Sequence, residues 1–153
     1  MWCVYAFYVK NSVIFSGAVI KKGAIVENSI IDENVVIEEN ALLKAESAFK
    51  ETGLPAVADD SGLEVDALGG QPGVYSARYA GEGATSDMLC DKILSEMENV
   101  DDENRGARFV SVVAIVYPDG KTLTLRGECE GRIIHEKRGG GGFGYDPVFY
   151  IED

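Results

Sequence analysis

The sequence predicts a mixed α/β domain from about residue 40 onward, a mixed sheet with flanking helices, preceded by a short β-rich segment. Three observations support this fold class. Aliphatic residues recur every six positions before residue 40, and apolar residues follow helical spacing directly after it. Short apolar runs separated by turn residues then follow along the chain. We therefore divide the chain into residues 1–39 and residues 40–153.

The N-terminal segment carries a six-residue repeat. Its aliphatic positions are Val13, Val19, Ile25, Ile31 and Ile37, and a small or slender residue stands four places after each. Residues 5–41 resemble the left-handed β-helix of sugar-nucleotide pyrophosphorylases, especially the ADP-glucose type, which uses about three hexads per coil. The segment holds fewer than two such coils, and solenoids need more to bury a core. An ordinary hairpin or meander is the alternative interpretation of the repeat.

A first helix is predicted from Asn40, because alanines and larger apolar residues then follow helical spacing. It should end at Thr52-Gly53, where glycine suits a left-handed cap. The apolar run Ala56-Val57-Ala58 predicts a buried strand that delivers Asp59-Asp60 at its end. Residues 62–84 read as glycine-rich loop or short strand.

The second half predicts a helix and a series of strands. Thr85 or Ser86 caps a helix that closes near Asn99, with apolar residues on its inner face. Phe109 to Val116 reads as a buried strand and Thr122 to Leu125 as the returning strand, joined by a turn at Pro118-Asp119-Gly120. A second turn is expected around Gly127 to Gly131.

Charge and composition limit the kinds of partner that the chain is expected to bind. The net charge is −12 over 153 residues, so the long-range field repels nucleic acid and anionic membranes, and neither is an expected partner. A phosphate substrate would need local positive charge, which a divalent cation held by carboxylates could supply together with basic residues such as Lys44, Arg78 or Arg108. The apolar start is too short to span a bilayer and has no basic flank. The three cysteines form no zinc or disulfide pattern, which favours a cytoplasmic protein.

Two adjacent carboxylates form the strongest chemical signal, in Asp59-Asp60-Ser61-Gly62. In an extended chain their side chains point to opposite faces, so one can enter a cleft while the other braces the chain. A carboxylate placed this way can bind Mg²⁺ and accept a proton from water, as phosphoanhydride hydrolysis requires. Taken alone, these four residues favour a plain turn with side-chain capping.

The segment from Gly139 to Pro147 is the second candidate, because a flexible run ends in aromatic residues and a carboxylate. Phe143 or Tyr145 can stack on a base, and Asp146 can accept hydrogen bonds from ring nitrogens. A surface hairpin with core aromatics is the equal alternative. His135, the only histidine, is expected to be satisfied or exposed rather than catalytic, which excludes a histidine-based triad.

Several motifs, in order, resemble the inosine/xanthosine triphosphate pyrophosphatase family, which hydrolyses ITP, dITP and XTP to the monophosphate and pyrophosphate. The resemblance covers about residues 39–150. Its motifs are Glu39-Asn40-Ala41-Leu42-Leu43-Lys44-Ala45, Gly53-Leu54-Pro55, Ala58-Asp59-Asp60-Ser61-Gly62-Leu63, Pro72-Gly73-Val74-Tyr75-Ser76-Ala77-Arg78-Tyr79-Ala80-Gly81, Arg108-Phe109 and Gly142-Phe143-Gly144-Tyr145-Asp146-Pro147.

The resemblance implies a Mg²⁺-dependent enzyme that forms a homodimer and acts on a purine nucleoside triphosphate. It places the general base and a metal ligand at Asp60. A second metal carboxylate falls at Asp32 by counting back from Lys44. The remaining implied positions are substrate contacts, with phosphate on Ser61 and Lys44 and the base on Phe143, Gly144, Tyr145 and Asp146.

Two motifs of that family are not matched. Nothing before residue 39 provides its Thr/Ser-x-Asn-x-x-Lys phosphate loop, and no Ser-His-Arg motif follows the Asp-Pro strand. We therefore expect impaired activity, in a chimeric or truncated product joined near Glu38 to Ala41. The alternative is a non-enzymatic remnant whose hexads mediate interactions. A sugar-nucleotide pyrophosphorylase is disfavoured, because nothing matches its catalytic domain.

Overall fold

The computed structural model describes residues 8–10, 13–14, 25–27, 30–31, 37–139 and 142–151. The chain forms two compact units, Met1–Val35 and Val36–Asp153, whose division lies a few residues before the boundary expected at residue 39. No helix in the described ranges is both long and apolar enough to span a bilayer.

The first unit contains two short parallel strand pairs. Strand β1 (Tyr8–Lys10) pairs with β3 (Ile25–Glu27), and β2 (Val13–Ile14) pairs with β4 (Ile30–Ile31). The partners in each pair are separated by about three hexads, and parallel pairing excludes a hairpin between these strands. Most of the repeat, and Asp32 with it, lies outside the described residues.

Helix α1 (Ile37–Thr52) opens the second unit. It starts three residues before the predicted Asn40, so Ile37, the last aliphatic of the hexad pattern, belongs to this helix and is buried by it. The predicted end at Thr52 is confirmed. Gly53 follows with φ 67°, and its amide donates to the Phe49 carbonyl at 2.8 Å.

Strand β5 (Ala56–Val65) corrects two expectations. Asp59 to Gly62 do not form a turn, and they do not follow the end of a short strand. They lie in the middle of a ten-residue strand. The whole strand pairs antiparallel with β6, and Asp60 lies opposite Val112. Long-range pairing overrides the poor strand propensity of these four residues.

Strand β6 (Gly106–Val116) and strand β7 (Thr122–Ile133) form a long hairpin. The turn at Pro118 to Gly120 is confirmed, with Gly120 at φ 80°. The second turn, expected around Gly127 to Gly131, is wrong, because β7 runs straight through it. A Cβ at Gly131 would lie 2.4 Å from the Tyr150 carbonyl oxygen, so this glycine provides room for the short strand β8 (Phe149–Tyr150).

Helix α2 (Ser86–Glu96) begins as predicted. The Thr85 hydroxyl accepts a hydrogen bond from the Met88 amide, and the helix ends before the expected Asn99. Short 3₁₀ helices complete the unit: η1 (Asp66–Leu68), η2 (Gly73–Arg78), η3 (Asp102–Asn104) and η4 (Asp146–Val148).

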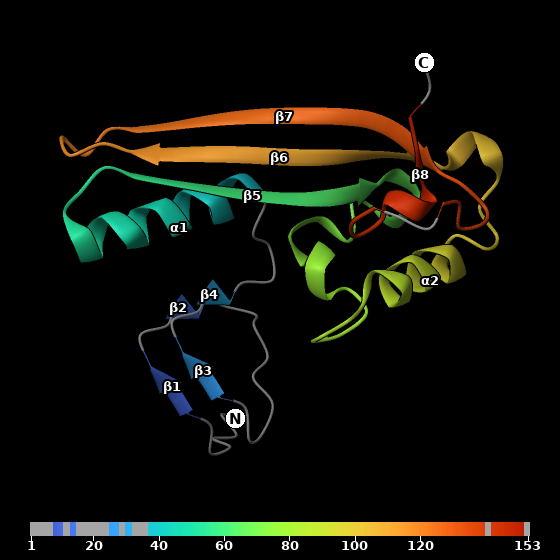
Figure 1. Ribbon diagram of the computed structural model, residues 1–153, viewed down its shortest axis with the longest axis horizontal. Helices are drawn as coiled ribbons and strands as arrows, with labels where there is room; N and C mark the ends of the chain where they lie inside the picture. Colours follow the sequence, from blue (N-terminus) through green and yellow to red (C-terminus); the bar gives the residue numbers. More distant parts are fainter. Residues whose placement is uncertain are drawn as a thin grey trace, which may run out of the picture. The chain divides into compact units, whose positions relative to one another are not determined.

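The second unit is a four-stranded antiparallel sheet, in the order β5-β6-β7-β8, with helices at both ends. Helix α1 lies beneath one end of the sheet, whereas α2 and η4 lie at the end near β8 (Figure 1). Each end has its own apolar core, one built on Ile37, Ala41 and Val112 and the other on Leu63, Ile93 and Ile133. The mixed α/β architecture predicted from residue 40 onward is thus observed.

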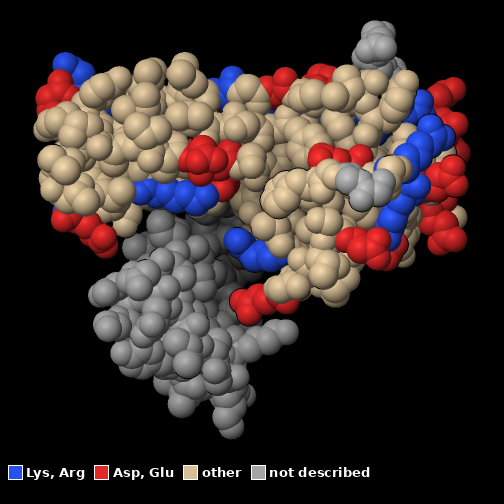
Figure 2. Space-filling view, in the orientation of Figure 1, with Lys and Arg blue, Asp and Glu red and all other residues tan. Residues whose placement is uncertain are grey.

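Charged side chains are mixed over the surface of this unit. On the face drawn in Figure 2, basic side chains form small separate groups among acidic ones. Acidic residues outnumber basic ones by 26 to 14 in the whole sequence, so any anionic ligand depends on local cations rather than on the overall field.

Candidate active site

The carboxylate of Asp60 is held by two side chains of α1. The Lys44 ammonium lies 2.6 Å from Oδ1, and the Asn40 amide donates to Oδ2 at 3.0 Å. Lys44 also donates to the Asp59 carbonyl at 3.1 Å. The Asp60 side chain is only 13% exposed. Both oxygens of a largely buried carboxylate are therefore oriented by one helix.

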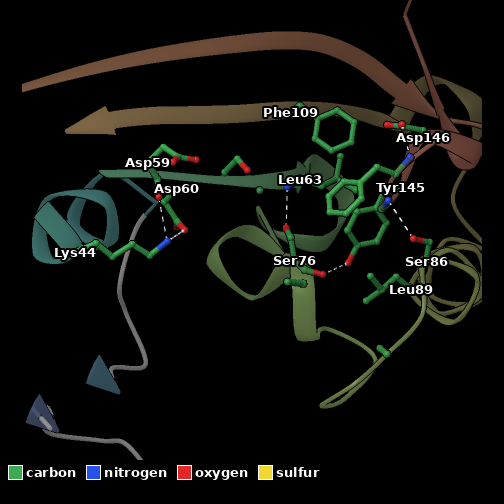
Figure 3. A pocket seen from close by; sticks show the side chains of 16 residues that line it. Lys44, Asp59, Asp60, Leu63, Ser76, Ser86, Leu89, Phe109, Tyr145 and Asp146 are labelled. Carbon is green, nitrogen blue, oxygen red and sulfur yellow. Dashed lines mark hydrogen bonds and ion pairs between the residues drawn. The ribbon is translucent and has the colours of Figure 1, made fainter. Parts of the chain in front are cut away.

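Local periodicity explains this arrangement. Asn40 and Lys44 are spaced by about one helical turn, so both side chains lie on the same face of α1. Alternation along β5 directs Asp60 toward that helix and Asp59 to the other side of the strand, as Figure 3 shows. The expectation that the two carboxylates point to opposite faces is confirmed.

A pocket of about 540 Å³ lies beside β5, the edge strand of the sheet. Consecutive residues of this strand, Asp59 to Leu63, line the pocket, so residues of both faces border it. Its lining comprises Lys44, Asp59, Asp60, Ser61, Gly62, Leu63, Ser76, Ala77, Ala84, Ser86, Leu89, Phe109, Phe143, Gly144, Tyr145 and Asp146. Every predicted site residue that the structure describes belongs to this lining, although the two motifs lie more than 80 residues apart.

The pocket has two chemically different ends (Figure 3). Lys44, Asp60 and Ser61 provide charged and hydroxyl groups at one end. Aromatic and aliphatic side chains, with Phe143 and Tyr145 among them, line the other. A ligand that fills both ends would combine an anionic or metal-binding part with a flat apolar part.

The loop that carries Phe143 is fixed to α2 and to itself. The Gly144 amide donates to the Ser86 hydroxyl at 3.2 Å, and the Phe143 amide donates to Asp146 Oδ2 at 2.7 Å. Phe143 is 88% exposed, so its ring is available to a ligand. Asp146 uses one oxygen on its own loop, which leaves the other for a polar group of a ligand.

Tyr145 is buried and bonded rather than exposed. Its hydroxyl donates to the Ser76 carbonyl at 2.8 Å, and burial raises the pKa of the phenol. The Ser76 hydroxyl in turn accepts from the Leu63 amide at 2.8 Å and donates to the Gly73 carbonyl at 2.7 Å. Ser76 thereby ties β5, η2 and the aromatic loop together around the pocket.

Sequence reasoning did not single out Asn40, Ser76 or Ser86 as site residues. In the sequence, Asn40 is the predicted start of a helix and part of a longer motif, Ser76 is part of another motif, and Ser86 is a possible helix cap. Their roles depend on partners far along the chain, and no local spacing signals such contacts. His135 is satisfied, as predicted, by the carboxylate of Asp102, whose pKa this hydrogen bond lowers.

A carboxylate such as that of Asp60 is chemically suited to hold a Mg²⁺ ion that is shared with a phosphate. The described residues contain no group of three or more potential metal-ligating side chains. Mg²⁺, however, commonly takes only one or two protein carboxylates and completes its shell with phosphate oxygens and water. Asp60 supplies one such carboxylate, while Asp32 lies outside the described residues.

A mixed α/β domain whose pocket is charged at one end and aromatic at the other is typical of proteins that bind small organic molecules in a concave site. Within that class, the chain belongs to the Ham1 family, whose family model matches residues 14–153. The family model therefore matches from residue 14, whereas the motifs that resemble the family begin only at residue 39.

Relatives with curated names agree with this assignment. A dITP/XTP pyrophosphatase of Desulfotalea psychrophila is 56% identical over 110 residues, which are 72% of this chain and 48% of the relative. The protein of the same name from Geobacter sulfurreducens is 54% identical over 110 residues, 72% of this chain and 55% of its own length. The chain spans about half the length of the curated relatives it matches.

Solved structures show the same fold. A nucleoside-triphosphatase / dITP/XTP pyrophosphatase from Mycobacterium abscessus matches with a TM-score of 0.75 at 39% identity, over 85% of this chain and 70% of that one. A HAM1 protein from Coxiella burnetii matches with a TM-score of 0.74 at 36% identity, over 94% of this chain and 82% of that one. The predicted fold class and family are thereby confirmed.

Proposed function

We propose that this chain hydrolyses non-standard purine nucleoside triphosphates, namely ITP, dITP and XTP, to the monophosphate and pyrophosphate with Mg²⁺ as cofactor. One observation carries the proposal: a single pocket joins the Asp60 and Lys44 end to the Phe143 to Asp146 loop. The names of the relatives support the same chemistry. A volume of about 540 Å³ lies within the usual range for small-molecule sites.

The charged end of the pocket binds the triphosphate and carries out the hydrolysis. Asp60 accepts the proton of the water that attacks between the α- and β-phosphates, since its carboxylate is partly buried and held in one orientation. Lys44 offsets negative charge on the phosphates, and the Ser61 hydroxyl donates to a phosphate oxygen. A Mg²⁺ ion held by Asp60, with Asp32 as the second candidate ligand, would neutralise phosphate charge.

The aromatic end holds the purine. Phe143 stacks on the base because its ring is exposed at the pocket. The Gly144 backbone approaches the base closely, and Asp146 accepts hydrogen bonds from ring nitrogens. Tyr145 closes this end with its buried ring. A homodimer, implied by the resemblance to the family, and a cytoplasmic location, favoured by the cysteine pattern, complete the proposal.

Pyrophosphate release tests the proposal. The full chain is assayed with ITP, XTP and GTP in Mg²⁺, beside Asp60→Asn and the neighbouring Asp59→Asn. Loss of a general base costs about 10²- to 10⁴-fold in rate, so Asp60→Asn should lose nearly all activity. Asp59→Asn, which changes the same residue type on the other side of β5, should retain most of it. Equal background in wild type and Asp60→Asn would refute the enzymatic assignment.

A non-enzymatic role of the N-terminal hexads is the second candidate. The parallel pairs β1–β3 and β2–β4, with partners about three hexads apart, favour a β-helix-like turn in this segment. Such a segment could mediate interactions while the pocket is vestigial. Deleting residues 1–35 then abolishes self-association in sedimentation, with no pyrophosphate release before or after the deletion. Nucleotide hydrolysis that depends on Asp60 would exclude this role as the only one.

A further inference from the structure

We propose that Asn40 is a positioning residue whose neutral amide fixes the plane of the Asp60 carboxylate. The inference deepens the proposed function and rests on it in taking Asp60 as the metal carboxylate. Asn40 Nδ2 lies 3.0 Å from Asp60 Oδ2, while the Lys44 ammonium lies 2.6 Å from Oδ1. Each oxygen of the carboxylate therefore has its own donor, and both donors favour one orientation of the group.

The chemistry of the two donors differs, and the difference matters for a cation. Lys44 carries a positive charge and is 47% exposed, so it can move away when a cation approaches the carboxylate. Asn40 is half-buried and uncharged. It therefore orients Asp60 without cancelling the negative charge that attracts a divalent ion. A second ammonium in its place would hold the carboxylate equally well but would repel the ion.

The position of Asn40 in the helix also restrains its hydrogen bond to Asp60. It lies in the first turn of α1, next to Ala41, which is fully buried against the sheet. The helix backbone at this point is held by packing, so the Asn40 side chain extends from a fixed position beside the Asp60 carboxylate. Partners that orient a metal ligand from outside the coordination shell contribute about 10- to 100-fold in metal affinity. We expect an effect of that size here.

Binding of Mn²⁺, followed by electron paramagnetic resonance, tests the role without requiring turnover. Asn40→Ala should weaken Mn²⁺ binding to the full chain about tenfold or more. Ser47→Ala, an exposed position on the same helix, is the matched control and should bind like wild type. Asn40→Ser, whose side chain is too short to reach Oδ2, replaces the alanine variant if that one fails to fold. Urea midpoints of all variants separate lost stability from lost affinity.

The outcomes separate this inference from the proposed function. Asn40 variants that bind Mn²⁺ as tightly as Ser47→Ala overturn the positioning role, and so does an Asp60→Asn variant with undiminished affinity. Weakened Mn²⁺ binding in both Asn40→Ala and Asp60→Asn supports the positioning role. If binding weakens in this way but neither the wild type nor any variant releases pyrophosphate, only the enzymatic proposal fails. In an active chain, Asn40→Ala should lower kcat more than it raises KM, because a misoriented carboxylate affects the reacting state most.

Discussion

Gly62 provides the sharpest test of how the pocket wall is built. A Cβ at this position would lie 2.2 Å from the Gly73 carbonyl oxygen and 2.9 Å from its carbon, both of which are backbone atoms. Neither can rotate aside, so Gly62→Ala must push η2 away from β5. The displacement would also strain the bond between the Leu63 amide and the Ser76 hydroxyl, which is 2.8 Å long.

The magnitude follows from these two effects. Overpacking costs about 1–3 kcal/mol, and loss of one buried hydrogen bond adds about 1 kcal/mol. Alanine also restricts the unfolded chain more than glycine does, which stabilises the folded state by about 0.4–1 kcal/mol. The net loss in unfolding free energy is about 2 kcal/mol. With a urea m-value of about 2 kcal/mol per molar, the unfolding midpoint should fall by about 1 M.

Gly127→Ala is the matched control for urea unfolding followed by circular dichroism. Gly127 also lies within a strand, but the nearest atom to an added Cβ is 4.0 Å away. Alanine is therefore accommodated there, and its midpoint should equal or slightly exceed that of wild type. If Gly62→Ala and Gly127→Ala unfold at the same urea concentration, the close approach of η2 to β5 is refuted.

Two further predictions concern charged groups away from the pocket. Burial opposes ionisation of Glu96, but hydrogen bonds from Lys92 and Tyr79 outweigh it and lower the pKa of this carboxyl. Its stabilisation is therefore present above the unfolded pKa of about 4.3 and is lost as pH falls through the folded pKa. The difference in urea midpoint between wild type and Glu96→Gln should shrink from about pH 7 to about pH 3, and a constant difference would contradict this. The buried Arg105 donates to four main-chain carbonyls. Arg105→Met removes all four hydrogen bonds, although the Met97 carbonyl still accepts from the Val100 amide at 3.1 Å. The substitution should lower the unfolding free energy by about 3 kcal/mol or more, whereas a loss below about 1 kcal/mol would show that the other carbonyls find new donors.

The elements predicted correctly are those that short-range chemistry determines. Gly53 ends α1 because glycine adopts a positive φ there, and Thr85 caps α2 with its own hydroxyl. The turn at Gly120 has the same local origin. Each signal lies within a few residues of the feature it predicts, so the sequence alone is sufficient.

The errors arise where distant partners decide the structure. Asp59 to Gly62 look like a turn in isolation but pair with β6, about 50 residues further along the chain. Gly131 looks like a turn residue but makes room for β8. In both cases the residue type is unfavourable or ambiguous locally, and sheet pairing overrides it. The same limit concealed Asn40 and Ser76, because their partners come from other elements.

The two aromatic residues of the glycine-rich loop show why site roles need a structure. Phe143 and Tyr145 are two positions apart and equivalent as stacking candidates in the sequence. Phe143 is 88% exposed and its side chain carries no hydrogen-bonding group. Tyr145 is 3% exposed, and its hydroxyl donates a hydrogen bond to the Ser76 carbonyl. Under the proposed function, the exposed ring of Phe143 is therefore the one that can stack on a base, whereas the fixed ring of Tyr145 forms part of the pocket wall. Because the Ser76 hydroxyl also accepts from the Leu63 amide, Tyr145 is connected through Ser76 to the same strand that carries Asp60.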